Sequence, residues 1–171
     1  MPILNSQETL ILEQANIDQK IVRMAYEVIE ENHDESKLTL IGIEPNGYKV
    51  ADKLMNAIKN ISDIHIDLYS LSLDKAEPVN KPLTYNFEPE QLNDQVCILV
   101  DDVGNTGRTL FYASRPFMKA APRKMRVAVL VDRSHKRFPI RSDYVGLPLS
   151  TTLKEHVVVK MEHEEAVYLE E

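Results

Sequence analysis

The chain has 171 residues, of which 43% are hydrophobic, and these values fit a single domain spanning residues 1–171 better than two ordinary domains. The formal net charge of -7 argues against a protein that binds nucleic acid indiscriminately. No apolar run approaches the roughly 18 residues that a membrane-spanning helix needs, and the N-terminal sequence lacks a signal-peptide pattern, so we expect a cytoplasmic protein. The single cysteine, Cys97, excludes an internal disulfide and a zinc site built from several thiolates.

The first part of the chain alternates between helical and extended patterns. Apolar residues recur at helical spacing over residues 17–28, and Asn16 is a suitable N-cap, so the sequence predicts a helix that starts there. Residues 38–43 read LTLIGI, a short apolar run that predicts a buried strand. A tight turn and a second helical stripe over residues 50–58 follow, which gives the order strand, turn and helix.

The second part continues this alternation. A strand with a mixed face is expected over residues 64–73, whereas the stretch 74–94 contains three prolines and has no periodicity, as is typical of a functional or mobile connection. A buried strand at 96–100, a helix over 109–120 and a strand at 126–131 complete another unit. The alternation predicts an α/β fold with a central parallel sheet of about five strands, in which ligands bind beyond the carboxyl ends of the strands.

The end of the 96–100 strand carries the most informative motif, VCILVDDVGNTGRTL, residues 96–110. Asp101 and Asp102 directly follow the apolar run, and a loop with two glycines then opens the next helix. Backbone N–H groups at a helix start bind phosphate, Thr hydroxyls add donors, and glycine lets the backbone approach closely. The two carboxylates would instead accept hydrogen bonds from sugar hydroxyls or hold a hydrated Mg²⁺ that neutralises a diphosphate. The motif therefore predicts a ligand with a phosphate, vicinal hydroxyls and a diphosphate.

Other interpretations of this loop explain less of the motif. The segment GNTGRT lacks the spacing and the Lys of a Walker A loop, and the chain contains no G-x-G-x-x-G, so neither a P-loop ATPase nor a Rossmann dehydrogenase is supported. A solvated strand-to-helix turn with Asp as the helix cap would explain one acid and one glycine. The second acid and the Thr-Gly-x-Thr pattern would remain without a reason.

The segment ILVDDVGNTGRT resembles the phosphoribosyl-diphosphate (PRPP) signature of the type I phosphoribosyltransferases. The segment VAVLVDRSHKRFPIRSDYVG, residues 127–146, is similar to one typical of the pyrimidine-operon attenuation regulators, which double as uracil phosphoribosyltransferases. The resemblance extends from VRMAYEVIEEN to EHVVVKM and so covers nearly the whole chain. It implies the type I phosphoribosyltransferase fold, with a parallel sheet flanked by helices and a small C-terminal hood.

The resemblance also implies an activity and partners. With Mg²⁺ as the cofactor, the chain would transfer phosphoribosyl from PRPP to a nucleobase, first of all uracil, to give UMP and diphosphate. Such a glycosyltransferase would serve pyrimidine salvage, would bind PRPP and a nucleobase or nucleoside monophosphate, and would form a homodimer or higher homo-oligomer. Asn105 stands where purine-specific relatives carry an acid, and this neutral amide favours a pyrimidine base.

The resemblance assigns roles to individual residues as well. Asp101 and Asp102 would be the catalytic residues, which bind the ribose hydroxyls and Mg²⁺, the latter through water or those hydroxyls. PRPP would also contact the loop that follows them, which consists of Val103, Gly104, Asn105, Thr106, Gly107, Arg108 and Thr109. The base side of the site would be formed by Asp132, Arg133, Val157 and Val158.

Two departures from the family concern the diphosphate. The family's diphosphate loop typically has Lys and Arg before its glycine, whereas this chain has Glu44, Pro45, Asn46 and Gly47. Where the family has Tyr-Arg-Asp-Asp, residues 69–72 read Tyr-Ser-Leu-Ser, with Lys75 and Lys81 as candidate substitutes for the arginine. Each lost charge interaction is worth about 4 kcal/mol at about 4 Å and an effective dielectric of about 20. The alternative function is therefore a catalytically weak or inactive nucleotide-sensing or RNA-binding regulator on the same fold.

A basic segment raises the question of an RNA partner. Residues 115–141 contain nine Lys and Arg and a single acid, a pattern that fits either a face for the phosphates of an mRNA leader or a solvated surface. The resemblance to the attenuation regulators places four residues on an RNA-binding face: Arg23, His135, Lys136 and Arg141. Val22, Tyr26 and Leu147 stand where polar or basic residues are usual. The segment 138–140 is equally compatible with a dimer contact.

Overall fold

The computed structural model describes residues 7–171. Its central sheet has the strand order β4-β3-β2-β5-β6-β7. Five neighbouring strands, β3, β2, β5, β6 and β7, run parallel, and β4 pairs antiparallel with β3. This confirms the predicted α/β class and its parallel sheet. The strands are β2 (Lys37–Ile43), β3 (His65–Ser72), β4 (Thr84–Tyr85), β5 (Val96–Gly104), β6 (Lys124–Asp132) and β7 (Tyr144–Pro148).

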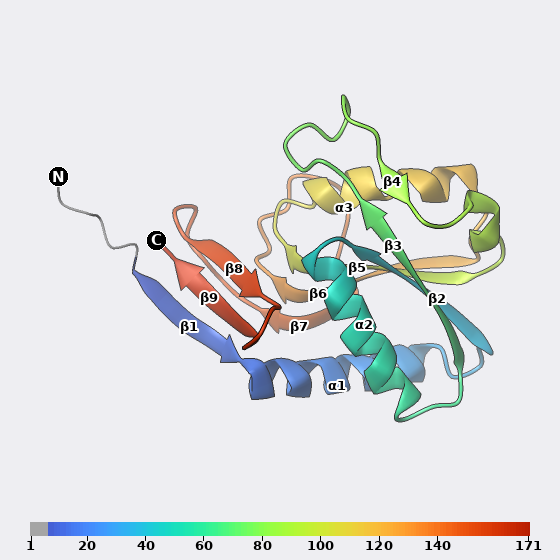
Figure 1. Cartoon of the computed structure of the whole chain (residues 1–171), viewed down its shortest axis with the longest axis horizontal. Coiled ribbons are helices and arrows are strands. Elements are labelled where there is room, and N and C mark those ends of the chain that lie inside the picture. The colour runs from blue at the N-terminus through green and yellow to red at the C-terminus, as the bar shows by residue number, and fades with distance from the viewer. Residues whose placement is uncertain (1–6) are drawn as a thin grey trace.

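A separate antiparallel sheet, the hood, lies beside the carboxyl ends of the central strands (Figure 1). It has the order β1-β9-β8, with β1 at Glu8–Glu13, β8 at His156–Lys160 and β9 at Ala166–Glu170. The predicted C-terminal hood is thus present, but its third strand comes from the N-terminal part of the chain. Strand β1 was not predicted from the sequence, because it acquires its hydrogen-bonding partner from the opposite end of the chain.

Helices cover both faces of the central sheet. On one face, α1 (Gln14–Glu31) and α2 (Asn46–Lys59) pack on apolar side chains such as Leu40 and Ile98, and Figure 1 shows α2 crossing in front of the sheet. On the other face, α3 (Arg108–Ala113) and the 3-10 helices η1 (Pro89–Leu92) and η2 (Arg115–Lys119) pack on the alternate side chains, such as Ile41 and Leu99. Successive residues of a strand point to opposite faces, so an uninterrupted apolar run such as LTLIGI supplies both cores.

Two predicted helix boundaries are wrong. Helix α1 starts one turn earlier than predicted: Glu13 is the N-cap, and Asn16 occupies N3, where its Oδ1 accepts the Glu13 N–H at 3.1 Å. The predicted helix 109–120 is broken after Ala113, and η2 replaces its second half. Pro116 cannot donate to the Tyr112 carbonyl, and the Arg115 Nε donates to it instead at 3.1 Å.

Cys97 lies fully buried in β5, as expected for a free cysteine within an apolar run. Burial, opposed by the charge of Lys37, raises the pKa of its thiol to about 12, so the side chain is a neutral part of the core. Across residues 7–171, no helix combines the length and the apolar character that crossing a bilayer requires.

The strand order places a topological switch point between β2 and β5. From β2 the chain proceeds to β3 on one side, and from β5 it proceeds through β6 to β7 on the other side. Neighbouring parallel strands whose following connections diverge leave a crevice at their carboxyl ends, and ligands bind there in open α/β sheets. Residues 44–47 connect the end of β2 to the first turn of α2, and residues 103–107 run from the end of β5 to the start of α3, so the fold brings two of the predicted site segments together.

Candidate functional site

The acid pair, Asp101 and Asp102, lies near the carboxyl end of β5, and Asp101 is only 2% exposed. Each carboxylate accepts a hydrogen bond from the following backbone N–H: Asp102 N donates to Asp101 Oδ1 at 2.9 Å, and Val103 N donates to Asp102 Oδ1 at 2.8 Å. Burial, and then the charge of Asp102, raise the pKa of Asp101 well above its ordinary value, while the charge of Lys75 opposes the rise. A site with two adjacent carboxylates favours ligand groups that donate hydrogen bonds or carry positive charge.

The diphosphate loop, residues 44–47, packs directly on the acid pair. A Cβ atom on Gly47 would lie 2.7 Å from the Val100 carbonyl oxygen and 3.1 Å from Asp101 Oδ1, so only glycine permits this approach. The Asn46 Nδ2 donates to Asp102 Oδ2 at 3.2 Å and to the Val159 carbonyl in the hood at 2.9 Å. The loop therefore connects the acid pair to the hood, a contact that the sequence analysis did not anticipate.

Glu44 lies away from the acid pair. It lines a shallow depression at the β3–β4 edge together with Ser70, Ser72, Thr84, Tyr85 and Asn86. It is not among the residues that line the cavity of the acid pair. Glu44 is also exposed, and water and salt therefore screen its repulsion of a diphosphate more than the value of about 4 kcal/mol assumes. The Glu44–Pro45 peptide bond is cis.

The phosphate loop, residues 103–109, surrounds a cavity of about 170 Å³ at the start of α3. Its lining contains most of the predicted phosphate-binding residues: Val103, Asn105, Thr106, Gly107, Arg108 and Thr109. Gly107 has a φ of 84° and would clash with Ile140 if it carried a Cβ, which explains the glycine. Gly104 is buried and does not line this cavity.

The segment that follows β6 braces the phosphate loop. Arg133 N donates to the Gly104 carbonyl at 2.8 Å, and Arg137 N donates to the Thr106 carbonyl at 2.8 Å. The Lys136 Nζ donates to Asp132 Oδ1 at 3.2 Å and to the Asn105 carbonyl at 3.4 Å. These contacts fix the backbone of the loop to the segment after β6. This support was not predicted, because the resemblance assigns Asp132 and Arg133 to base contacts and His135 and Lys136 to RNA contacts.

A second cavity, of about 280 Å³, joins the acid pair to the hood. Arg133 and Val157, two of the four base-side predictions, line it together with His156, which the sequence did not single out. Arg133 is 5% exposed and donates from its guanidinium to Thr151 Oγ1 at 2.9 Å and to backbone carbonyls of the same loop. Asp132 and Val158 lie next to lining residues in the chain but do not line this cavity.

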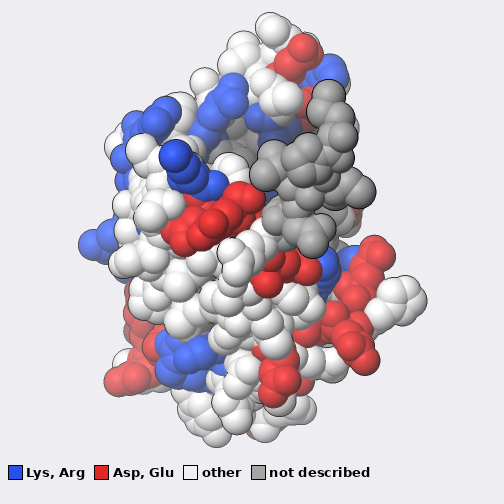
Figure 2. Space-filling view, turned by 90° about the vertical axis from the view of Figure 1, so that its left-hand side faces the viewer, with Lys and Arg blue, Asp and Glu red and all other residues white. Residues whose placement is uncertain are grey.

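The four candidate RNA-binding residues do not form one open patch. Arg23 donates to Glu27 at 2.7 Å and to the carbonyls of Val145 and Gly146, and His135 contacts the Thr151 carbonyl at 3.0 Å. Lys136 contacts Asp132, as described above, whereas the Arg141 side chain is 88% exposed. Seen from the hood side, several Lys and Arg lie in the upper part of the surface above a band of Asp and Glu, and a further basic patch lies in the lower part (Figure 2).

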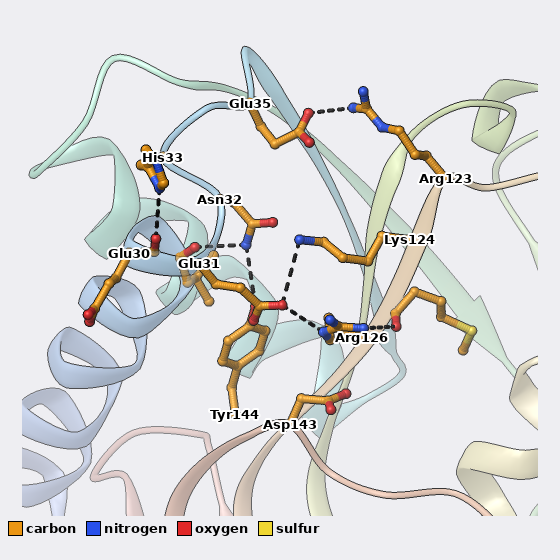
Figure 3. A network of polar contacts seen from close by, with 12 residues as sticks. Glu30, Glu31, Asn32, His33, Glu35, Arg123, Lys124, Arg126, Asp143 and Tyr144 are labelled. Atoms are coloured by element: carbon orange, nitrogen blue, oxygen red, sulfur yellow. Dashed lines mark hydrogen bonds and ion pairs between the residues drawn. The ribbon is translucent and has the colours of Figure 1, made fainter.

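Part of the basic segment is neutralised within the protein. The Arg126 Nε lies 2.8 Å and the Lys124 Nζ 3.6 Å from Glu31 Oε1, at the end of α1. Arg123 pairs with Glu35, which follows α1 in the chain (Figure 3). These three cations belong to a folded polar network and not to a free surface stripe. Because these Lys and Arg are already paired with carboxylates of the protein, less positive charge is available for the phosphates of an RNA.

The acid pair fits the coordination habits of Mg²⁺. Within residues 7–171, no three His, Cys, Asp or Glu side chains converge to form a metal-binding cluster. Mg²⁺ usually keeps several waters and is bound by one or two carboxylates together with substrate phosphates. Asp101 and Asp102 at the wall of a cavity supply those carboxylates.

Comparisons with known proteins identify the family of the chain. The family model for the phosphoribosyl transferase domain matches residues 8–165. The Bifunctional protein pyrR of Enterococcus faecalis is 34% identical over 158 residues, with 89% of each chain covered. The Bifunctional protein PyrR of Bacillus subtilis is 34% identical over 166 residues, with 92% of each chain covered.

Solved structures show the same fold. A mutant of the hypoxanthine phosphoribosyltransferase of Trypanosoma cruzi, complexed with the product IMP, has a TM-score of 0.80 at 13% identity, over 100% of this chain and 93% of that one. A hypoxanthine-guanine phosphoribosyltransferase of Bacillus anthracis has a TM-score of 0.69 at 14% identity, over 85% and 84% of the two chains. The protein has the type I phosphoribosyltransferase fold and belongs to the phosphoribosyltransferase family.

Proposed function

We propose that this chain transfers the phosphoribosyl group of PRPP to uracil and so produces UMP and diphosphate. The observation that carries the proposal is that the two cavities are adjacent, since they share Lys75, Val103, Asn105 and Thr109 in their linings. One cavity is surrounded by the phosphate loop and the other contains the acid pair. A molecule with a phosphate beside a ribose can occupy both at once. The neutral Asn105, where purine-specific relatives carry an acid, supports a pyrimidine base.

The acid pair would act on the ribose. Its carboxylates would accept hydrogen bonds from the ribose hydroxyls, and their charge would stabilise the positive charge that develops on the sugar while the bond to diphosphate breaks. The phosphate loop would fix the other end of the sugar and thus the orientation of the reacting carbon. Bound Mg²⁺ would supply positive charge for the departing diphosphate.

The direct test is an incubation of the purified protein with PRPP, Mg²⁺ and each of uracil, hypoxanthine, guanine, adenine and orotate. We expect nucleotide only with uracil, detected by chromatography, and none with the Asp102→Asn variant. Formation of a purine nucleotide would refute the choice of base. No nucleotide from any base, with the wild-type protein folded, would refute transferase activity.

A second candidate function is a nucleotide-sensing or RNA-binding regulator on the same fold. It is favoured by Asn46, whose amide contacts Asp102 where the family presents cations to the diphosphate. The resemblance to attenuation regulators adds an mRNA leader as the partner, and it also leads us to expect a homo-oligomer. A regulator should bind a pyrimidine leader transcript more tightly than a scrambled transcript, with a measurable salt dependence. Equal affinity for both transcripts would rule out specific RNA recognition.

A further inference from the structure

We propose that Lys75 is the residue that binds the diphosphate, in place of the cations that the diphosphate loop and residues 69–72 lack. The inference deepens the proposed function and rests on it for the identity of the ligand. Lys75 follows β3 in the chain and lies at the point where the two cavities meet. No other Lys or Arg within residues 7–171 lines both of them.

Lys75 lies beside the acid pair. It lines the same cavity as Asp101 and Asp102. An ammonium at this place would neutralise an anionic group held next to the two carboxylates. A diphosphate attached to a ribose on the acid pair is such a group.

The other cations of the two cavities are less suited to this role. The guanidinium of Arg133 is buried, and its donors are used by Thr151 and by the carbonyls of Thr152 and Glu155. Arg108 lines only the cavity of the phosphate loop. Lys75 is exposed, and within residues 7–171 it takes part in no ion pair, so its charge is free for a ligand.

Anchors on both sides hold Lys75 in place. Asp74 Oδ1 accepts the backbone N–H groups of Ala76 and Glu77, each at 2.9 Å, which closes a tight turn around Lys75. Farther along, the Arg115 guanidinium donates to the carbonyl of the buried Pro78 at 2.8 Å. The backbone of the turn is thereby fixed, while the flexible lysine stem can follow a ligand.

Lys81, the other candidate substitute, differs from Lys75 in its contacts. The Lys81 ammonium lies 2.9 Å from Asp74 and 3.8 Å from Glu77, so its charge is already paired. Lys81 thus serves the turn from which Lys75 projects, and it provides a matched control of the same residue type in the same segment.

The test is calorimetric titration of inorganic diphosphate with Mg²⁺, and separately of ribose 5-phosphate, into the wild type and three variants. For Lys75→Ala we expect diphosphate affinity to fall about 10- to 100-fold, the size of one lost charge-assisted hydrogen bond, with ribose 5-phosphate affinity nearly unchanged. Lys75→Arg should keep most of the diphosphate affinity, and Lys81→Ala should change it by less than about threefold.

Three results would overturn the assignment. These are absence of diphosphate binding by the wild type, unchanged affinity in Lys75→Ala, and an equal loss of ribose 5-phosphate, which would make Lys75 part of the phosphate loop instead. A selective loss in Lys75→Ala would uphold the assignment even if the wild type formed no nucleotide. In that case the transferase proposal alone would fail.

Discussion

The two ends of the parallel sheet treat carboxylates in opposite ways. At the amino end of β6, Glu31 accepts hydrogen bonds from Tyr144 and from Arg126 and lies 3.6 Å from Lys124 (Figure 3). At the carboxyl end of β5, Asp101 and Asp102 lie side by side, and their protein donors are backbone N–H groups and the Asn46 amide. One end satisfies its charges within the protein, whereas the other leaves negative charge for a ligand to satisfy.

The pKa shifts express this contrast. Burial opposes the ionisation of Glu31, but hydrogen bonds from Tyr144 and Arg126 outweigh it and lower the pKa of the carboxyl. Ionised Glu31 therefore stabilises the fold above the ordinary carboxyl pKa, and this contribution is lost as the pH falls. For Asp101, burial and the charge of Asp102 raise the pKa, so its ionisation costs stability as the pH rises. The polar contacts of Glu31 therefore stabilise the folded protein. The negative charge of the acid pair destabilises it, and ligand binding at this pair would offset that cost.

The largest expected effect is on binding at the acid pair. Replacement of both Asp101 and Asp102 by Asn should weaken PRPP binding at least roughly 100-fold, because each hydrogen bond to a charged group contributes about 1.5–3 kcal/mol. Calorimetric titration with Mg²⁺ present measures the affinity, and circular dichroism checks that the variant folds. Retention of wild-type affinity by the folded variant would show that the ribose binds elsewhere.

The opposite end should respond in stability and not in binding. Glu31→Gln removes the charged partner of Arg126 and should lower the free energy of unfolding by about 1–3 kcal/mol at neutral pH, measured by urea titration. The deficit should shrink as the pH falls through the carboxyl range, because the wild-type carboxylate is then protonated. Glu30→Gln is the control, since its exposed side chain lies outside the network and should change stability by less than about 0.5 kcal/mol. A loss of PRPP affinity in Glu31→Gln would contradict the prediction that this end of the sheet acts on stability and not on binding.

Asp101→Asn alone should raise the stability of the protein, whereas most substitutions of buried residues lower it. Without ligand, we expect this variant to melt at a higher temperature than the wild type at neutral pH, because the amide avoids a buried negative charge and can still accept the Asp102 N–H. The advantage should vanish below the ordinary Asp pKa of 3.8, where the unfolded carboxyl is protonated as well. Melting curves between pH 3 and 8 measure it, and a variant less stable than the wild type at every pH would contradict the origin assigned to the pKa shift.

The smallest effect should come from Asn46. Asn46→Ala removes donors to Asp102 and to the Val159 carbonyl and should cost about 0.5–1.5 kcal/mol of unfolding free energy. The hood should loosen first, which amide hydrogen exchange in β8 would detect as faster exchange than in β6. Unchanged exchange in β8 would mean that the hood is held in place without this contact.

A large part of the candidate site could be predicted from local sequence. The acid pair and the phosphate loop are one continuous segment, and an apolar run followed by two acids and a glycine loop has few structural solutions. The parallel sheet is readable for the same reason, since Leu40, Ile98 and their neighbours alternate between two cores. The break before Pro116 was also readable in principle, because proline removes the donor that the helix would need.

The remainder depends on contacts between distant segments. Nothing near Asn46 in the sequence indicates that its amide bridges Asp102 and the hood, and nothing near β1 identifies β9 as its partner. Lys75 and Lys81 have the same chemistry and similar neighbours, and only the turn around Asp74 decides which ammonium is paired. Such choices follow from packing and hydrogen-bond geometry and have no periodic signature.

The most direct test of the site is a crystal structure of the protein with Mg²⁺ and a non-reactive PRPP analogue. We predict that the 5-phosphate lies in the cavity of residues 103–109 and that the ribose hydroxyls donate to Asp101 and Asp102. An analogue bound in another cavity, or with its ribose turned away from both carboxylates, would contradict the central role of the acid pair.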